Sequence, residues 1–588
     1  MKIIYLKIEN YRNLSGLEIH LNPHNNFIVG ENNLGKSNFL QLLSTLFTRK
    51  SFKRDDFTEI TDPIEVAFTL ELEEVEIGLF DDLFDPTDAS KINIKAIQNT
   101  IDDPIDFWHV ESNTRIPASM VKFLNFLYYD SVRNPSSELS FNKSKGVGKF
   151  LHHVIIKHLE NSGETDGDFV DAGMTDNLAV FVNSVICKVK AFSQYSITAE
   201  VERDVENLLS RILILKDGND KYIHQSGYGV QFLAIITLAI LQKILETIEL
   251  KRDRGIFEYN EPEGDDEVKK AISLIIGFDE PEIHLHPYLQ RSLVKYINKI
   301  LTNQEEDFAE LLQSIFGLNK VIGQSIIATH SPSIILNDYT EVMRFYKTGA
   351  TVSVISGTQV TIEAKLKKHL DMQFPFLKEA FFARFVLVVE GITEYSALPS
   401  FGMKLGYDFD EYGISVIEAG GKESVEPILK LLEKFHIPCL GIVDKDEDPV
   451  TTNPLIRQTT KRDFEVEVIS FLMDSGKENI LKQIVNDYTG APVDEHSGEI
   501  IYTTFQTGLL EKNKTKYSSF INPATVIAGN LRLSAIPPAE TELKKLWYLT
   551  FFLKKKDIVL GGIIGENLSD AEIPQVYKDI INDAILLS

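Results

Sequence analysis

Short apolar runs alternate with amphipathic segments along most of the chain. Alternating apolar and polar positions over 1–20 predict two strands, and further strand candidates lie at 64–74, 124–129, 273–278, from 324, at 342–346 and at 352–360. Apolar positions spaced i, i+3, i+4 predict helices over about 147–212, separated by a polar surface loop at 160–177. Another apolar strand opens a further region at 384. Strands that alternate with helices in this way indicate an α/β architecture with largely parallel sheets.

Length and composition narrow the class of protein. A chain of 588 residues is too long for one hydrophobic core, so about two to four domains are expected. Its two cysteines, Cys187 and Cys439, exclude a disulfide framework and a structural zinc site, which suits a reducing cytoplasm. We expect no targeting leader and no membrane span, because no apolar run of about 18 residues is present. The net charge of -26 argues against a nucleic-acid coat but allows a local basic groove.

The stretch "IVGENNLGKSNFL" at 28–40 fits the phosphate-loop pattern G-x-x-x-x-G-K-[ST]. In such a loop the glycines turn backbone N–H groups toward a polyphosphate, the lysine reaches the outer phosphates and the serine ligates Mg²⁺. A surface loop of similar composition is the alternative. The context favours phosphate binding, because a buried strand precedes the loop and an apolar helical pattern follows Lys36. The candidate nucleotide-binding residues here are Gly30, Asn33, Gly35, Lys36, Ser37 and Asn38.

Three further elements occur in the order expected of an ATPase. Asp279-Glu280 end a buried strand, where the first acid would hold the Mg²⁺ shell and the second would orient the attacking water. His330 ends the next apolar strand, where it can sense a γ-phosphate. Ser226-Gly227 open a helix that would cap a nucleotide held by a second subunit. Each element alone could be a helix cap or a structural histidine, but the four together predict a nucleotide site.

The third region places acids directly after hydrophobic strands. Glu390 ends one strand, with Glu394 four residues on, and Asp444 and Asp446 follow another. Acids at the ends of neighbouring parallel strands meet at one edge of a sheet, and carboxylate oxygens suit Mg²⁺ or Mn²⁺. A run of solvated acids is the alternative, and it is preferred only for 447–448. The pattern predicts a metal site able to act on phosphodiesters.

The first half resembles the ABC-type ATPases. Gly30, Lys36 and Ser37 match Walker A, Ser226-Gly227-Tyr228-Gly229 the signature, Asp279-Glu280 Walker B, and His330 the H-loop. The signature departs from the usual L-S-G-G at Gln225 and Tyr228. In ABC proteins an insertion lies between phosphate loop and signature. The helical stretch at 147–212 occupies that place, and we interpret it as a dimerisation element.

The acids resemble the Toprim fold, and an ABC-type ATPase followed by a Toprim domain is the layout of the OLD (overcoming lysogenization defect) family nucleases. The nuclease subunit of the Gabija anti-phage system belongs to that group, and retron-associated OLD nucleases are similar. The resemblance implies metal binding by Glu390, Glu394, Asp444 and Asp446, with a further acid downstream. Among Asp463, Glu465 and Glu467 we favour Glu465, then Glu467. It also implies a late lysine that stabilises charge at the scissile phosphate, chosen among Lys554, Lys555 and Lys556, of which we favour Lys556.

These observations lead to the following expectations. The domains are an ATPase half at 1–146 and 213–375, the insertion at 147–212, and a Toprim nuclease domain at 376–588. The resemblance implies a metal-dependent DNA endonuclease regulated by its ATPase and acting in anti-phage defence. Its catalytic residues would be Glu390, Asp444, Asp446, Lys556, Glu280 and His330. The alternative is an ATP-driven DNA-binding clamp or regulator with a vestigial Toprim site.

The expected cofactors and partners follow from the two halves. The Toprim site would take Mg²⁺ or Mn²⁺, and the ATPase site would take ATP with Mg²⁺. The partners would be DNA, ATP and further copies of the chain, in a dimer or a larger even-numbered assembly. A helicase subunit, or a retron reverse transcriptase with its RNA, is a candidate further partner, and no membrane partner is expected.

Overall fold

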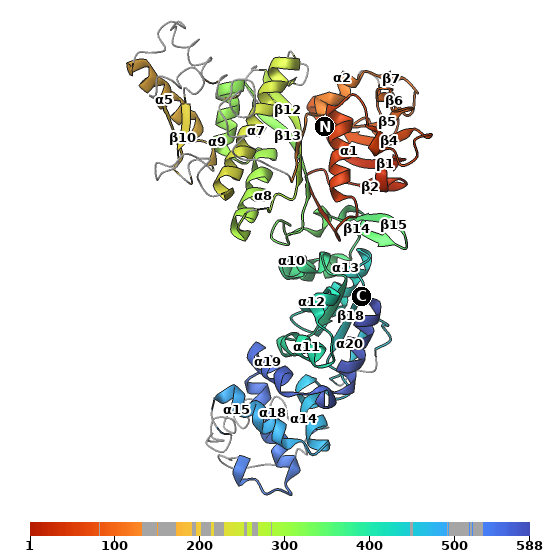
Figure 1. The fold of residues 1–588 in the computed structure, drawn as a ribbon, viewed down its shortest axis with the longest axis vertical. Helices are drawn as coiled ribbons and strands as arrows, with labels where there is room; N and C mark the ends of the chain where they lie inside the picture. The colour runs from red at the N-terminus through yellow and green to blue at the C-terminus, as the bar shows by residue number, and fades with distance from the viewer. Residues whose placement is uncertain are drawn as a thin grey trace. The chain divides into compact units, whose positions relative to one another are not determined.

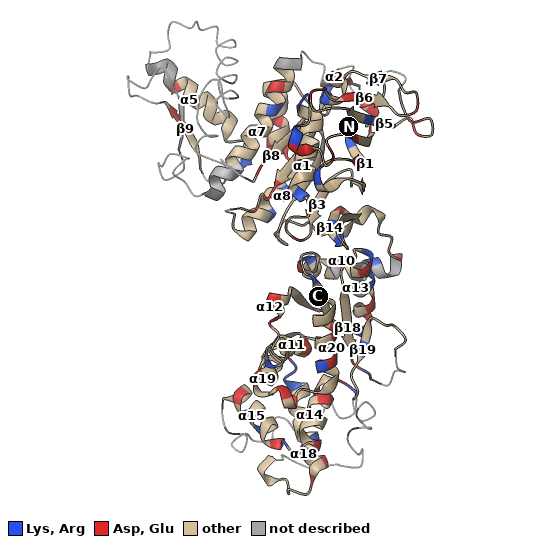
Figure 2. Cartoon of the chain, turned by 45° about the vertical axis from the view of Figure 1, so that its right-hand side comes forward, with Lys and Arg blue, Asp and Glu red and all other residues tan. Residues whose placement is uncertain are grey.

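A computed structural model gives the fold as two compact units, Met1–Gln359 and Val360–Ser588 (Figure 1). The structure describes residues 1–80, 83–131, 150, 154, 172–190, 194, 196–201, 213–216, 228–251, 256–260, 268–283, 285–446, 451–490, 492, 517, 520 and 533–588. Within these ranges, no helix is both long enough and apolar enough to cross a membrane. Basic and acidic residues are interspersed over the described elements (Figure 2).

The larger sheet of the first unit carries the nucleotide loop. Its described strands follow the order β11-β12-β13-β3-β14-β15, with β8 paired to β12. Strands β8, β12, β13, β3 and β14 are parallel, whereas β11 and β15 run antiparallel to their neighbours. The strands are β3 Asn25–Val29, β8 Phe126–Tyr129, β11 Ile256–Tyr259, β12 Lys269–Asp279, β13 Lys320–Ala328, β14 Val342–Thr348 and β15 Thr351–Ser356. The burial of β12 and β13 along nearly their whole lengths explains their almost continuous apolar sequences.

A second sheet adds an antiparallel layer to this largely parallel architecture. Its order is β2-β1-β4-β5-β6-β7. The strands are β1 Lys2–Glu9, β2 Leu17–His20, β4 Ile64–Glu71, β5 Lys91–Gln98, β6 Asp106–His109 and β7 Arg115–Ile116. In β4 and β5 buried and partly exposed residues alternate, because only one face packs on the core. The strands expected near 1–20 and 64–74 are therefore confirmed in this sheet, and the one expected at 124–129 is β8 of the larger sheet.

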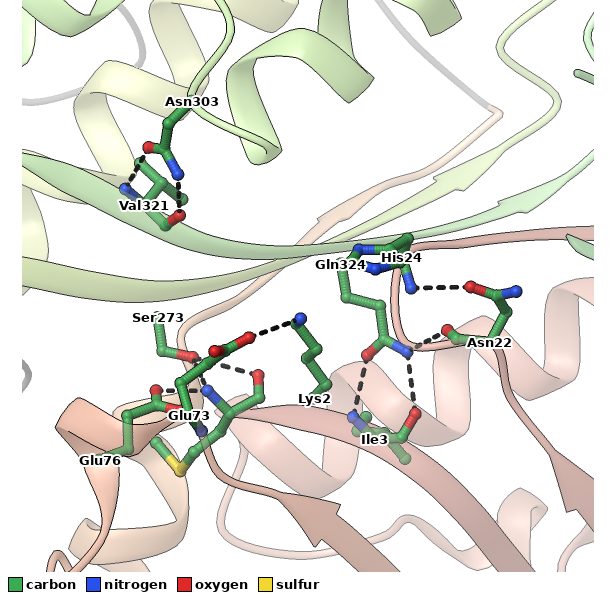
Figure 3. Close-up of polar contacts among 11 residues, drawn as sticks. Lys2, Ile3, Asn22, His24, Glu73, Glu76, Ser273, Asn303, Val321 and Gln324 are labelled. Atoms are coloured by element: carbon green, nitrogen blue, oxygen red, sulfur yellow. Dashed lines mark hydrogen bonds and ion pairs between the residues drawn. The ribbon is translucent and has the colours of Figure 1, made fainter. Parts of the chain in front are cut away.

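A buried glutamine joins the two sheets of this unit (Figure 3). Gln324 on β13 accepts a hydrogen bond from the Ile3 N–H at 2.9 Å and donates to the Ile3 carbonyl at 2.8 Å. It also donates to the Asn22 carbonyl at 2.8 Å. The side chain thus pairs with β1 as a neighbouring strand would, which satisfies backbone groups that would otherwise be buried without partners. This contact fixes β1 against the sheet that carries the nucleotide loop.

The described helices of the first unit are α1 Lys36–Thr48, α2 Ala118–Val121, α5 Ala172–Ile186, α7 Tyr228–Lys251, α8 Pro287–Leu301 and α9 Glu306–Leu311. Helix α5 lies within the stretch expected to be largely helical, but it begins at Ala172, inside the 160–177 segment expected to be a loop, so that expectation is wrong at 172–177. The expectation of helix is also wrong at Thr198–Val201. That segment forms strand β9, antiparallel to β10 at Leu213–Lys216. Its alternating pattern, Thr-Ala-Glu-Val, is too short for periodicity to separate strand from helix, and pairing with β10 decides it. Most of 147–171 and 202–212 lies outside the described residues.

The second unit contains a four-stranded parallel sheet with the order β17-β16-β18-β19 in its described part. The strands are β16 Phe385–Val389, β17 Ile414–Glu418, β18 Cys439–Val443 and β19 Ile456–Gln458. The helices are α10 Ala364–Leu377, α11 Ile392–Lys404, α12 Phe409–Tyr412, α13 Lys422–Lys434, α14 Phe464–Asp474, α15 Glu478–Thr489, α18 Thr541–Lys554, α19 Ile558–Asn567 and α20 Gln575–Leu587. Because the strands are parallel, their carboxyl ends meet at one edge, where ligands of open α/β sheets bind.

Candidate functional sites

The loop between β3 and α1 has the backbone of a phosphate cradle. Gly30 has φ +130°, and a Cβ there would lie 2.1 Å from the Phe345 carbonyl oxygen, so a larger residue does not fit. Gly35 caps α1 with φ +97°, and a Cβ there would collide with the Leu14 side chain. Asn33 also adopts a left-handed φ of +63°. A loop with this geometry directs N–H groups and the positive end of α1 toward an anion.

Lys36 is buried inside this loop. Its Nζ donates to the carbonyl oxygens of Gly30 at 2.8 Å and Glu31 at 2.7 Å. Burial lowers the pKa of Lys36 to about 8, although the carboxylates of Glu280 and Asp279 act in the opposite direction. The loop carbonyls therefore hold the ammonium group inside the loop. A bound phosphate would provide a stronger, charge-assisted partner for the same group.

The acids predicted at the end of β12 lie at this loop. Ser37 Oγ donates a hydrogen bond to Asp279 Oδ1 at 3.0 Å, so the side chains of the serine and of the first acid lie next to each other. Glu280 takes a left-handed φ of +48°, and the His330 Nε2 lies 3.6 Å from its Oε1. Burial lowers the pKa of His330, with Lys36 lowering it further and Glu280 raising it. Strained backbone at a polar cluster of this kind is typical of functional sites.

Two contacts of the nucleotide site had no signal in the sequence. Glu282 accepts a hydrogen bond from the His330 backbone N–H and so fixes the loop that carries the histidine. Arg12, with φ +43°, contacts Asp56, and its Nη1 donates to Asn38 Oδ1 at 2.7 Å. The side-chain oxygen of Asn38, a nucleotide-binding candidate, is therefore engaged by Arg12. Both contacts join residues far apart in the chain, which no local pattern reveals.

The signature residues Gln225, Ser226 and Gly227 lie outside the described residues, and α7 begins directly after them at Tyr228. Their expected role in capping a second subunit's nucleotide stays a prediction.

The second unit builds its acidic site at the carboxyl ends of β16 and β18. Glu390 follows β16, and its Oε2 accepts a hydrogen bond from the Asp444 N–H at 2.9 Å. Asp444 follows β18, and its Oδ1 accepts from the Phe464 N–H at 3.2 Å, at the start of α14. Glu394 lies in the first turn of α11, as expected from its spacing. Helix N-termini favour negative charge, which is why this edge of the sheet tolerates several buried acids.

Lys556 lies among these acids. Its Nζ donates to Glu465 Oε2 at 3.0 Å, and Glu465 is fully buried. Burial alone would lower the pKa of Lys556, but Glu465, Glu394 and Asp444 outweigh it and raise that pKa above its usual value. Burial, followed by the charge of Glu394, raises the pKa of Asp444 to about 9. Burial and then Glu465 raise the pKa of Glu394 to about 8. The acids therefore repel one another, and the lysine offsets only part of that repulsion.

The donor set fits a hard divalent cation. Glu394 Oε2 and Glu465 Oε1 are buried and accept no hydrogen bond from the described residues. Unpaired carboxylate oxygens in a crowded acidic cluster are the ligands that Mg²⁺ and Mn²⁺ prefer. Within the described ranges, however, no three Asp, Glu, His or Cys side chains are already arranged around one metal position.

Asp446 is held by two cations that the sequence analysis missed. Lys422 Nζ lies 3.4 Å from Asp446 Oδ2 and also donates to the Asp444 carbonyl at 2.5 Å. Arg462 Nη2 lies 3.4 Å from Asp446 Oδ1. Asp446 itself has a left-handed φ of +49°. The sequence does contain a signal for Lys422. This residue directly follows "EAGG" at the end of β17, and β17 ends at the same sheet edge as β16 and β18.

If the acids cleave phosphodiesters as the sequence predicts, Lys422→Ala should reduce cleavage about tenfold to a hundredfold, because it removes a charge-assisted contact of roughly 1.5–3 kcal/mol from Asp446. The matched control is Lys434→Ala, an exposed lysine in the last turn of the same helix. Initial rates of plasmid nicking measure both variants. Equal rates for Lys422→Ala and the control would remove Lys422 from the site.

The other candidates of the sequence lie as follows. Asp463 caps α14 by accepting from the Val466 N–H at 2.9 Å, and it also accepts from the Tyr517 hydroxyl. Glu467 accepts from the Thr460 hydroxyl at 2.6 Å. Lys555 lies over the Tyr488 ring. Of the acids and lysines between which the sequence left a choice, Glu465 and Lys556 are thus the pair in mutual contact.

Comparison with known proteins agrees with the division of the chain into two units. The family model "AAA ATPase domain" matches residues 1–161 and 155–335, and the model "Overcoming lysogenization defect protein-like, TOPRIM domain" matches 381–446. "Endonuclease GajA" of Bacillus cereus is 24% identical over 73% of this chain and 71% of its own length. "Old nuclease" of Escherichia phage P2 is 22% identical over 76% and 77%. "OLD nuclease" of Thermus scotoductus is 21% identical over 76% and 82%.

The fold and the two sites define an ATPase domain joined to a Toprim domain. The chain belongs to the AAA ATPase domain family over more than half of its length. Its second unit matches the OLD-like Toprim model, and the relatives that align with most of the chain are named as an endonuclease or OLD nucleases.

Proposed function

We propose that this chain is a metal-dependent DNA endonuclease whose activity is regulated by ATP in its first unit. The observation that carries the proposal is the group of buried acids Glu394, Asp444 and Glu465 around Lys556, with two carboxylate oxygens that lack partners among the described residues. The names of relatives that span most of the chain support the same activity.

The acids and the lysine of the second unit have different proposed roles. The proposed ligands of Mg²⁺ or Mn²⁺, which would supply Lewis-acid stabilisation of a phosphate and an activated water, are Glu390, Glu394, Asp444, Asp446 and Glu465. Glu390 holds the Asp444 backbone through its hydrogen bond and so orients that ligand. Lys556 carries a firmly retained proton, so its ammonium can neutralise charge that develops on the scissile phosphate.

The first unit supplies nucleotide binding. Lys36 and the 30–35 loop would bind the phosphates of ATP, and Ser37 with Asp279 would bind its Mg²⁺. Glu280 would orient water, and His330, adjacent to it, would respond to the γ-phosphate. Nucleotide state would then regulate cleavage in the second unit.

Supercoiled plasmid incubated with the protein tests the activity. Nicked or linear product should form with Mg²⁺ or Mn²⁺, disappear with EDTA, and change in rate when ATP is added. Intact plasmid under all metal conditions, with nucleotide binding retained, would favour instead a DNA-binding ATPase whose Toprim site is vestigial.

A role in anti-phage defence is the biological part of this proposal, and it rests on the resemblance to the OLD family. Cells that express the chain with its neighbouring genes should form fewer plaques than cells that express Asp444→Ala with the same genes. Equal plaque numbers across a panel of phages would contradict this role. The neighbouring genes would identify a helicase subunit or a retron reverse transcriptase as the partner.

We also expect a dimer or a larger even-numbered assembly without nucleotide, in which the signature at Ser226 would act on the nucleotide of a second subunit and the 147–212 insertion would supply the contact. Light scattering at micromolar concentration should give at least twice the chain mass of 66.5 kDa. A monomer with and without ATP would exclude action of the signature between subunits.

A further inference from the structure

Helix α19, which follows Lys556, is unusually rich in glycine. Three of its ten residues are glycine: Gly561, Gly562 and Gly565. Glycine inside a helix costs roughly 1 kcal/mol relative to alanine, so three of them need a compensating reason. The helix is capped by Asp557, which accepts a hydrogen bond from the Leu560 N–H at 2.8 Å. Lys556 directly precedes this cap, so its position depends on the position of α19.

Two of these glycines lie against α11, the helix that carries Glu394. A Cβ at Gly561 would be 2.3 Å from the Thr393 carbonyl oxygen, and a Cβ at Gly565 would be 2.5 Å from the Ser400 Cβ. Because residues 561 and 565 meet successive turns of α11 in the same chain direction, the two helices run parallel with their N-termini side by side. Small residues at such a contact allow the backbones to approach more closely than any side chain would permit.

Gly562 lies on the edge of this contact. A Cβ there would meet only the Ser396 hydroxyl oxygen, at 3.2 Å, and that hydroxyl can rotate away. The three glycines therefore differ in what an added methyl group would displace. At Gly561 it meets a backbone carbonyl, and at Gly562 a movable side-chain end. At Gly565 the main obstacle is the Ser400 Cβ at 2.5 Å, with the Ala397 carbonyl oxygen at the looser distance of 3.2 Å.

The close approach places Lys556 at the acids. The carboxyl end of β16 leads directly into α11, so α11 is fixed to the sheet edge where Glu390 and Asp444 lie. A Cβ built at Gly391, the cap of α11, would lie 3.9 Å from the Lys556 Cε and 3.2 Å from Glu394 Oε2. Lys556 then reaches Glu465 on α14 at 3.0 Å. A shift of α19 away from α11 by a few tenths of an ångström or more would carry the ammonium group with it.

We propose that Gly561 and Gly565 are positioning residues for Lys556. They set the distance between α19 and α11 and thereby hold the lysine ammonium at Glu394 and Glu465. This role rests on the proposed nuclease function, in which Lys556 acts at the scissile phosphate. A purely structural role of the glycines would affect stability without a specific effect on Lys556.

The test compares Gly561→Ala, Gly565→Ala and the control Gly562→Ala in the full-length protein. Plasmid nicking gives kcat and KM, and mass spectrometry gives the rate at which acetic anhydride modifies Lys556 relative to Lys434. Gly561→Ala and Gly565→Ala should lower kcat at least tenfold with little change in KM and raise Lys556 modification about threefold or more. Gly562→Ala should match the wild type within twofold, because its added methyl group displaces only a hydroxyl.

A double variant that exchanges the small and the larger residue across the contact separates a positioning role from a general loss of stability. Ser400→Gly removes the Cβ that an alanine at 565 would meet, so the double variant Gly565→Ala/Ser400→Gly should regain most of the lost kcat and the wild-type Lys556 modification rate. The same exchange should not rescue Gly561→Ala, whose obstacle is a backbone carbonyl. Absence of rescue at 565, or equal behaviour of all three alanine variants, would overturn the proposal. Wild-type protein that cuts no plasmid would instead contradict the nuclease function, while the modification rates would still report where Lys556 lies.

Discussion

Replacing Asp444 by asparagine should lower plasmid cleavage about 10³-fold or more while nucleotide binding in the first unit stays unchanged. The substitution keeps the size of the side chain and removes one charged oxygen from the proposed metal ligands, an effect of several kcal/mol on the transition state. Asp474→Asn is the matched control, since that exposed acid ends α14, the helix whose first turn carries Glu465. Cleavage rates in Mg²⁺ and Mn²⁺ and binding of a fluorescent ATP analogue measure both effects. Wild-type nicking by Asp444→Asn would remove Asp444 from the site.

The same substitution should stabilise the metal-free protein. The pKa of Asp444 is raised to about 9 by burial and by Glu394, so the folded state holds a proton that the unfolded chain releases near pH 4. Stability contributed by this group therefore falls as pH rises from about 4 toward 9. Asparagine removes that dependence. The melting temperature in EDTA at pH 8 should be higher for Asp444→Asn than for the wild type, and a lower value would contradict the repulsion between the acids.

The acids and the phosphate loop could be predicted because each lies at the end of a short apolar strand. Strand β16 is buried along its whole length, and its sequence "FVLVV" shows this without a structure. Once the strands are taken as parallel, residues that follow them, such as Glu390 and Asp444, must meet at one sheet edge. The same reasoning placed Asp279 near Ser37, and the structure gives a hydrogen bond between them.

Other features depend on contacts between distant segments. The sequence left a choice among Asp463, Glu465 and Glu467. Glu465 contacts Lys556, whereas Glu467 accepts a hydrogen bond from Thr460 and Asp463 caps α14. Lys422 and Arg462 beside Asp446 were not anticipated, although Lys422 follows a strand that ends at the same sheet edge, because only acids at strand ends were considered and not the cations that pair with them. In the sequence the glycines of α19 are only poor helix formers. Their close contact with α11 can be recognised only in the structure. Strand β9 was missed because four residues carry too little periodicity.

In the first unit, Lys36→Ala and Glu280→Gln should separate nucleotide binding from hydrolysis. Lys36→Ala removes a buried ammonium group that a phosphate would engage by charge-assisted hydrogen bonds of roughly 1.5–3 kcal/mol each, so ATP affinity should fall by about tenfold to a hundredfold. Glu280→Gln keeps the side-chain shape but cannot accept a proton, so ATP should still bind while hydrolysis falls about 10²-fold to 10⁴-fold. Glu306→Gln, at an exposed position on α9, is the control for loss of a negative charge. Fluorescence titration with an ATP analogue and release of inorganic phosphate measure the two steps.

If all three variants hydrolyse ATP as fast as the wild type, the loop and the acids of this unit do not form an ATPase site. If Glu280→Gln binds ATP and still cuts plasmid at an altered rate, nucleotide binding rather than hydrolysis regulates the second unit.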